Sequence, residues 1–130
     1  LTPLAILLVA LGAAVGAPAR FLVERRLAGA YPWGTFVVNV VGSAVLGGVV
    51  AAAGTSASTP VVALVGIGFC GALTTFGGFA AQVLDLAVAP SGVHGGQRMV
   101  RSLVYAALSV AVCVAVAAIS YVTVVSLTSG

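Results

Sequence analysis

The sequence predicts an all-α membrane protein with four transmembrane helices, the third of which is broken in the middle of the membrane. Hydrophobic residues make up 62% of the 130-residue chain and charged residues only 5%, whereas a soluble domain averages about 25% charged residues. The chain divides into four apolar segments, and each reaches the roughly 20 residues that are needed to cross a bilayer. The third segment contains clustered glycines, which disfavour a continuous helix.

The first apolar segment covers residues 4–23. Its small residues before Arg20 resemble a signal-peptide cleavage site, but no basic residues precede the segment, and we interpret it as a transmembrane helix. Gly12, Gly16 and Arg20 recur at intervals of four and therefore share one helical face, on which another helix could approach closely. Arg20 has two interpretations: its side chain extends to the lipid headgroups, or it attracts anions to a vestibule.

The second segment, residues 33–53, begins with Trp33, an aromatic residue typical of the membrane interface. Small or polar residues then follow at intervals of four, namely Thr35, Asn39, Ser43 and Gly47. An amide near the middle of a membrane helix must find a polar partner. Asn39 could join two helices, or it could line a pore and offer N–H donors, and the continuous polar face favours the pore.

The third segment, residues 61–88, contains the stretch GIGFCGALTTFGGF at positions 66–79. Irregular backbone inside a bilayer is tolerated only where it is buried in protein or lines a wet cavity. Carbonyl groups freed by a helix break could bind a cation, and freed N–H groups could face an anion. Phe76 and Phe79 could turn the positive edges of their rings towards a narrow anion path, and simple packing is the alternative.

The fourth segment, residues 100–127, repeats the polar spacing with Arg101, Tyr105, Ser109 and Cys113, and Tyr121 falls near the same face. Hydroxyl groups four residues apart would lie about 6 Å from one another along a helix. Such a row could pass a small anion along. The connections at 24–32, 54–60 and 89–99 are short and rich in turn residues, so neighbouring helices are expected to be antiparallel.

The positions of the charged residues exclude several classes of function. Glu24 and Asp85 both lie near the ends of predicted helices, whereas a proton-coupled exporter of cations would need a carboxylate inside the membrane. The chain has no phosphate-binding loop, and we expect neither an enzyme nor a nucleotide-driven pump. The arginines form no basic stripe with interleaved aromatic residues, so we expect no binding of nucleic acid.

Four motifs together resemble the Fluc fluoride channel family, also called CrcB. They are Gly12-x-x-x-Gly16-x-x-x-Arg20-Phe21, Pro32-Trp33-Gly34-Thr35, Asn39 with Gly42-Ser43, and Gly68-Phe69-Cys70-Gly71-Ala72-Leu73-Thr74-Thr75-Phe76. The resemblance covers nearly the whole chain and implies a single four-helix transmembrane channel domain over residues 1–130. It also implies an antiparallel dimer with two fluoride pores and a structural Na⁺ at the dimer centre.

The resemblance also implies a role for particular residues. It assigns the fluoride pathway to Arg20, Asn39, Phe76, Phe79, Tyr105 and Ser109. It assigns the Na⁺ site to the main-chain carbonyls of Gly71 and Thr74. The sequence departs from the family pattern at Gly77 and Gly78, where the family usually has a serine and a threonine, and at Ala72, where a second glycine is common.

The implied function is passive, fluoride-selective export across the plasma (inner) membrane of a prokaryote. With four helices, the loops that contain Arg25, Arg26 and Arg98 fall on one side, which the positive-inside rule places in the cytoplasm. A subunit that pairs with its own inverted copy should show almost no such bias. We therefore predict a heterodimer with a homologous subunit of opposite orientation, and a homodimeric fluoride channel is the alternative.

Two further alternatives come from other classes of protein. A small four-helix multidrug-type exporter would need a membrane-embedded glutamate in its first helix, which this chain lacks. An inert assembly subunit would use the polar faces only to join helices. Anion flux through the reconstituted protein separates these possibilities.

Overall fold

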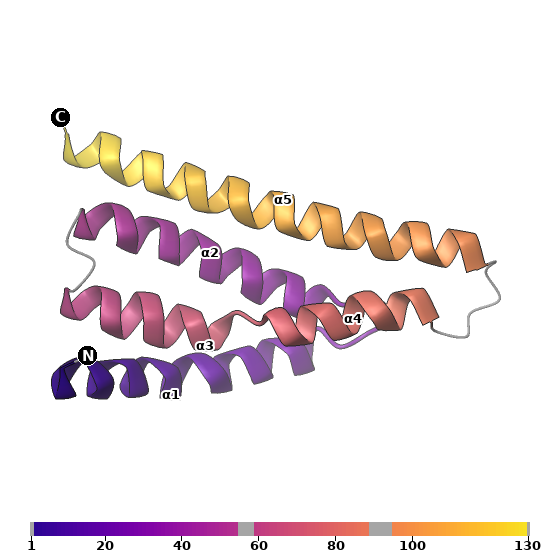
Figure 1. Ribbon diagram of the computed structural model, residues 1–130, viewed down its shortest axis with the longest axis horizontal. Helices are drawn as coiled ribbons and strands as arrows, with labels where there is room; N and C mark the ends of the chain where they lie inside the picture. Colours follow the sequence, from indigo (N-terminus) through magenta and orange to yellow (C-terminus); the bar gives the residue numbers. More distant parts are fainter. Residues whose placement is uncertain (1, 55–58, 89–94, 130) are drawn as a thin grey trace.

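A computed structural model describes residues 2–54, 59–88 and 95–129 and confirms the all-α fold with a broken third helix. Four helical segments are long and apolar enough to cross a membrane: Pro3–Arg26, Trp33–Ala53, Val62–Val88 and Gly95–Thr128. They lie side by side as long rods, and the first helix begins at the same end of the bundle at which the last helix ends (Figure 1).

Helix α1, Pro3–Arg26, starts with a side-chain cap. Thr2 Oγ1 accepts a hydrogen bond from the Ala5 N–H at 3.2 Å, and Pro3 occupies the first turn, where its missing N–H is not needed. The helix continues to Arg26, three residues beyond its predicted end. The predicted connection at 24–32 was therefore too long at its start, and Glu24 lies in the last turn of α1.

The predicted glycine face of α1 is a close contact with the third helix. A Cβ atom on Gly12 would collide with the Leu64 carbonyl, and a Cβ atom on Gly68 would lie only 2.6 Å from the Val9 carbonyl oxygen. Both positions need the absence of a side chain because the two backbones touch. In a membrane, where no hydrophobic effect joins helices, such close contact is a main source of association.

Helix α2, Trp33–Ala53, has the predicted bounds and lies against α5 over much of its length (Figure 1). Helix α5, Gly95–Thr128, begins five residues before its predicted start. Residues 95–99 were assigned to a loop because of their glycines and Arg98, and this assignment was wrong. At 34 residues, or about 50 Å, α5 exceeds the roughly 30 Å hydrocarbon core, so its polar first turns can extend into water. The predicted connections at 54–60 and 89–99 fall largely outside the described residues.

The third helix consists of several pieces: a π-helical segment η1, Val62–Cys70, a short α3, Gly71–Leu73, and α4, Phe76–Val88. Between α3 and α4, Thr74 is extended, with φ −78° and ψ 156°. The break was predicted from the glycines, but Gly71 itself is helical, with φ −63° and ψ −34°. The chain leaves the helix at Thr74 and Thr75, which together are called the break below.

Candidate functional site

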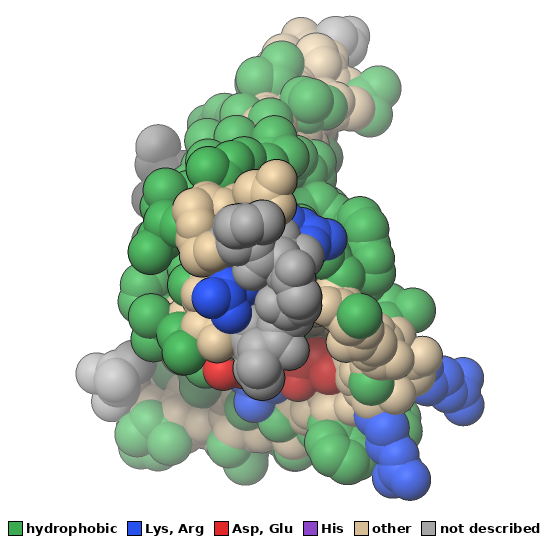
Figure 2. Space-filling view, turned by 90° about the vertical axis from the view of Figure 1, so that its right-hand side faces the viewer, with side chains coloured by type: hydrophobic (Ala, Val, Ile, Leu, Met, Phe, Trp, Pro, Cys, Tyr) green, Lys and Arg blue, Asp and Glu red, His purple; other side chains and the backbone are tan. Residues whose placement is uncertain are grey.

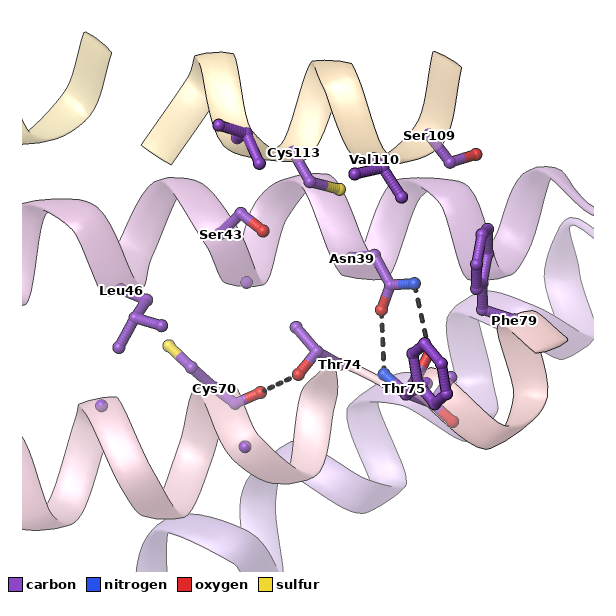
Figure 3. Close-up of a pocket in the computed structure, with 15 residues that line it drawn as sticks. Asn39, Ser43, Leu46, Cys70, Thr74, Thr75, Phe79, Ser109, Val110 and Cys113 are labelled. Atoms are coloured by element: carbon purple, nitrogen blue, oxygen red, sulfur yellow. Dashed lines mark hydrogen bonds between the residues drawn. The ribbon is translucent and has the colours of Figure 1, made fainter. Parts of the chain in front are cut away.

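The break opens onto a cavity of about 360 Å³ between α2, α5 and the third helix, called the break cavity below. Figure 3 shows side chains from α2 and α5 on one wall and from the third helix on the other. No charged side chain among the described residues lines it. Its polar lining side chains are Asn39, Ser43, Cys70, Thr74, Thr75, Ser109 and Cys113.

Asn39 binds the main chain of Thr75 at both of its polar groups. Its Oδ1 accepts a hydrogen bond from the Thr75 N–H at 2.8 Å, and its Nδ2 donates to the Thr75 carbonyl at 3.3 Å (Figure 3). In a continuous helix the Thr75 N–H would donate to the Gly71 carbonyl. The Asn39 amide therefore replaces a helical partner of Thr75 and deprives the Gly71 carbonyl of its usual donor.

The two threonines of the break cap the helical pieces on either side. Thr74 Oγ1 donates to the Cys70 carbonyl at 2.8 Å, which satisfies the end of α3. Thr75 Oγ1 accepts from the Gly78 N–H at 3.0 Å, which is the N-cap geometry for α4. The adjacent threonines were part of the predicted interruption, but their capping role was not predicted, although a threonine three residues before a helical N–H is a known capping pattern.

Gly42 of α2 makes room for the break. A Cβ atom at this position would collide with Thr74 Cγ2. Gly42 lies one turn beyond Asn39 on α2, so one helix both binds the break and accommodates it.

Arg20 reaches the break from α1. Its Nη1 donates to the Thr74 carbonyl at 3.3 Å, and the side chain is partly buried. The guanidinium thus lies where the first half of the third helix ends, and helix C-termini carry a partial negative charge that favours cations. Arg20 was expected at the headgroups or in a vestibule, and this main-chain contact is a role that neither interpretation included.

The two phenylalanines lie side by side at the start of α4, with ring centroids 6.3 Å apart. Phe79 also lies next to Tyr105 of α5, at 5.8 Å. Phe76 is 83% exposed in the single chain. Its ring must therefore be covered by lipid or by another protein chain, although it also lines the break cavity.

The polar face predicted on α5 divides into two parts. Tyr105 and Ser109 are buried, with 3% and 4% of their surfaces exposed, and Tyr105 donates its hydroxyl hydrogen to the Pro32 carbonyl at 3.3 Å. Ser109 lines the break cavity, but its Oγ is buried and has no hydrogen-bond partner of normal geometry among the described residues. Arg101 and Tyr121, by contrast, are exposed and do not line this cavity.

One buried polar residue of α5 was not singled out from the sequence. Ser102 is 2% exposed, and its hydroxyl donates to the Val83 carbonyl at 2.6 Å. This bond joins α5 to α4 and thereby positions the half-helix that carries both phenylalanines. A serine one residue after Arg101 falls outside the four-residue spacing, so the sequence gave no signal for it.

Both carboxylates lie away from the break cavity, as their sequence positions predicted. A second cavity of about 320 Å³ is lined by Glu24, Asp85 and other residues at the arginine-bearing end. Glu24 Oε1 accepts a hydrogen bond from the fully buried Thr35 hydroxyl at 3.1 Å. Figure 2 views this end of the molecule, where acidic and basic side chains gather on a largely hydrophobic protein.

The break also offers main-chain oxygens that suit a cation. The Gly71 carbonyl has lost its helical donor, and the Thr74 carbonyl receives the bond from Arg20. Unwound carbonyls of this kind coordinate Na⁺ in other broken membrane helices. No group of three or more His, Cys, Asp or Glu side chains within residues 2–54, 59–88 and 95–129 could hold a metal, so a metal ion at the break would need uncharged oxygen ligands such as these carbonyls.

Comparison with known proteins gives a consistent result. Residues 7–121 match the family described as CrcB-like protein, Camphor Resistance (CrcB). The fluoride-specific ion channel FluC 1 of Frankia casuarinae is 50% identical over 91 residues, which cover 62% of this chain and 70% of the relative. FluC 1 of Streptomyces avermitilis is 40% identical over 75% of this chain and 82% of the relative. FluC 2 of Rhodococcus jostii is 40% identical over 86% and 91%.

Proposed function

We propose, because the chain belongs to the CrcB family, that it is a subunit of a passive channel that exports fluoride across the plasma membrane of a bacterium. The relatives are named fluoride-specific ion channels, which also supports the prediction that the chain is not an enzyme. The observation that carries the proposal is the break cavity, because it places uncharged polar groups from three helices at membrane depth. That one channel domain occupies residues 1–130 stays a prediction.

The geometry of the break cavity fits the passage of a small anion. Fluoride that leaves water needs hydrogen-bond donors, since a buried charge without partners is very unfavourable. Asn39 uses only one of its two amide hydrogens on the Thr75 carbonyl, and the Ser43 hydroxyl lines the same cavity one turn further along α2. The ring edges of Phe76 and Phe79, which both line the cavity, would add positive potential where they face the anion, and no carboxylate among the described residues lines the cavity to repel it.

The break would also hold a structural Na⁺ through the carbonyls of Gly71 and Thr74. A bound cation would supply a fixed positive charge beside the anion path. Gly71 supports this assignment because the residue is exposed in the single chain and its carbonyl has lost its helical donor. Arg20 already donates to the Thr74 carbonyl, and a carbonyl oxygen has two lone pairs.

The partner would be a homologous subunit of opposite orientation. Phe76, 83% exposed, and the open side of the break are the surfaces that a second subunit would cover. Arg25 and Arg26 at the end of α1 and Arg98 at the start of α5 favour one orientation of this chain, which supports a heterodimer over a homodimer. Relatives bear the names FluC 1 and FluC 2, which is compatible with more than one such chain in a cell.

A multidrug-type exporter is less well supported by the same observations. Such an exporter would bind cationic drugs through a carboxylate in the membrane, whereas Glu24 lies in the last turn of α1 and accepts a hydrogen bond from Thr35. An inert assembly subunit would have no use for a cavity that gathers uncharged polar side chains from three helices. Both alternatives predict no fluoride flux.

The test is fluoride efflux from liposomes loaded with potassium fluoride, started with valinomycin and followed with a fluoride electrode. The chain is reconstituted alone and together with a homologous chain whose arginines lie on the opposite loops. Flux in either sample supports the channel, and absence of flux in both overturns it. Robust flux from the chain alone overturns the heterodimer. Phe79→Ile should reduce the flux, whereas Phe21→Ile, an exposed residue of α1, should not.

A further inference from the structure

Helix α4 has little packing of its own to fix its position in the bundle. None of its 13 residues is buried in the single chain. Within the described residues its backbone packs against α5, lies near α2 only sparsely and does not approach α1. The break also separates α4 from the continuous main-chain hydrogen bonds that would otherwise join it to α3. The position of this half-helix must therefore depend on a few particular contacts.

Ser102 of α5 supplies one of these contacts. Its side chain is 2% exposed, and its hydroxyl donates to the Val83 carbonyl at 2.6 Å. Between residues that the structure describes, no other side-chain hydrogen bond joins α4 to another helix. Helices in a membrane associate through close packing and hydrogen bonds, because no hydrophobic effect operates between them. A buried hydroxyl that bonds to a neighbouring helix is therefore a specific attachment point for α4.

The two phenylalanines lie between this attachment point and the break. Asn39 holds the main chain at Thr75, just before α4 begins. Ser102 holds α4 at Val83, about two turns or about 12 Å further along the helix. Phe76 and Phe79, which line the break cavity, fall within this interval. The part of α4 that faces the cavity is thus fixed at both of its ends.

The same faces of α4 and α5 carry the contact between Phe79 and Tyr105. Phe79 lies four residues before Val83 and shares a face of α4 with it. Tyr105 lies three residues after Ser102 and shares a face of α5 with it. Because α4 and α5 run antiparallel (Figure 1), the hydrogen bond and the ring contact at 5.8 Å are successive steps along one interface. Rotation of α4 about its axis would break the bond and move the Phe79 ring at the same time.

We infer that Ser102 is a positioning residue of the fluoride pathway: its bond to the Val83 carbonyl fixes the rotation of α4 and thereby places the Phe79 ring beside Tyr105. The inference rests on the proposed function and adds to it a residue outside the cavity. Ser102 does not line the break cavity, so it acts on the anion only through the half-helix that it holds.

Ser102→Ala tests this role, because it removes the hydroxyl without leaving a carbonyl unpaired. The Val83 carbonyl lies within α4, where the N–H four residues later also donates to it. We expect fluoride efflux per folded subunit to fall at least about 3-fold, within the range that one neutral hydrogen bond controls. Ser120→Ala is the control, since Ser120 lies on the same helix beside Gly48 of α2, and it should stay within about 2-fold of the natural protein. A smaller fall in Ser102→Ala overturns the inference.

A second measurement follows the Phe79 ring itself. A fluorine-labelled phenylalanine at position 79 gives an NMR resonance that depends on the neighbouring Tyr105 ring. Ser102→Ala should shift this resonance, and Ser120→Ala should leave it unchanged. Ser102→Thr keeps the hydroxyl and should restore both the resonance and the efflux. If Ser102→Ala does not fold, Ser102→Cys takes its place, because it nearly keeps the volume of serine and offers only a weak donor.

The two measurements separate this inference from the proposed function. If the natural protein carries no fluoride, alone or with a partner, the proposed function fails, and the resonance of residue 79 still decides whether Ser102 positions the ring. If that resonance is the same with and without the Ser102 hydroxyl, the inference is wrong whatever the efflux. If efflux falls only in proportion to the folded protein that is lost, Ser102 is a purely structural contact and the inference is again wrong.

Discussion

Asn39 and Thr75 are joined by two hydrogen bonds in which a side-chain amide pairs with the main chain on both sides of one residue. The two residues are 36 positions apart, so α2 holds the third helix open at a fixed height in the bundle. The main-chain N–H and carbonyl groups next to the break, which a continuous helix would pair with one another, then become available to ions.

Replacement of Asn39 with leucine should destabilise the protein. The Thr75 N–H and carbonyl would both lose their partner, and each buried polar group left unpaired costs about 1–3 kcal/mol. Thermal unfolding in detergent measures the loss. Ser43→Ala is the matched control, because Ser43 lines the same cavity one turn away and should change stability little. Equal effects of the two substitutions would contradict the role assigned to Asn39.

Replacement of Thr75 with valine should loosen the first turn of α4. Valine has nearly the same shape but cannot accept the hydrogen bond of the Gly78 N–H, and loss of an N-cap costs about 1 kcal/mol. Thr75→Ser retains the acceptor and should behave like the natural protein. Hydrogen exchange at residues 78–80 reports the change directly. Faster exchange in both variants, or in neither, would argue against the cap.

Gly42→Ala should disturb the break from the side of α2. The added methyl group would collide with Thr74 Cγ2, and overpacking of this kind costs about 1–3 kcal/mol. Thr74→Ser removes that methyl group and keeps the hydroxyl that bonds to Cys70, so the double variant should recover most of the lost stability. Gly29→Ala, where nothing lies within 4 Å, is the control. Failure of Thr74→Ser to rescue Gly42→Ala would show that this contact is not the cause.

Substitutions of Arg20 separate its charge from its hydrogen bond. Arg20→Lys keeps the charge near the Thr74 carbonyl, whereas Arg20→Gln keeps a donor and loses the charge. If the charge draws anions inwards, Arg20→Gln should lower fluoride flux several-fold, and the difference should shrink at high salt because of screening. Arg26→Gln, on the exposed last turn of α1, is the control. A salt-independent effect would favour a purely structural role.

The sequence was sufficient for the helices because their signal is local. The length and apolar character of each segment predicted its span, and the end of α1 and start of α5 differ from prediction only where arginines and glycines continue a helix beyond the lipid. Contacts between distant residues were not predictable in the same way. The bond from Arg20 to Thr74 spans 54 residues, and the sequence alone cannot show which groups such side chains reach.

The break illustrates the same limit within one segment. Glycines weaken a helix, and they correctly predicted that the third helix would be interrupted. They could not determine where, because a weakened helix breaks at the point at which other groups satisfy the released backbone. Those groups are the amide of Asn39 and the hydroxyls of Thr74 and Thr75. Two of the three lie in the segment itself, so the capping pattern of the adjacent threonines was the signal that could have located the break.

The most direct measurement compares fluoride and chloride efflux from the same liposomes, which contain this chain together with an oppositely oriented homologue. The account predicts rapid loss of fluoride with no measurable loss of chloride, and a marked fall in fluoride efflux when Asn39 is replaced with leucine. Equal efflux of the two halides, or fluoride efflux that does not change when the pairing of Asn39 with Thr75 is removed, would contradict it.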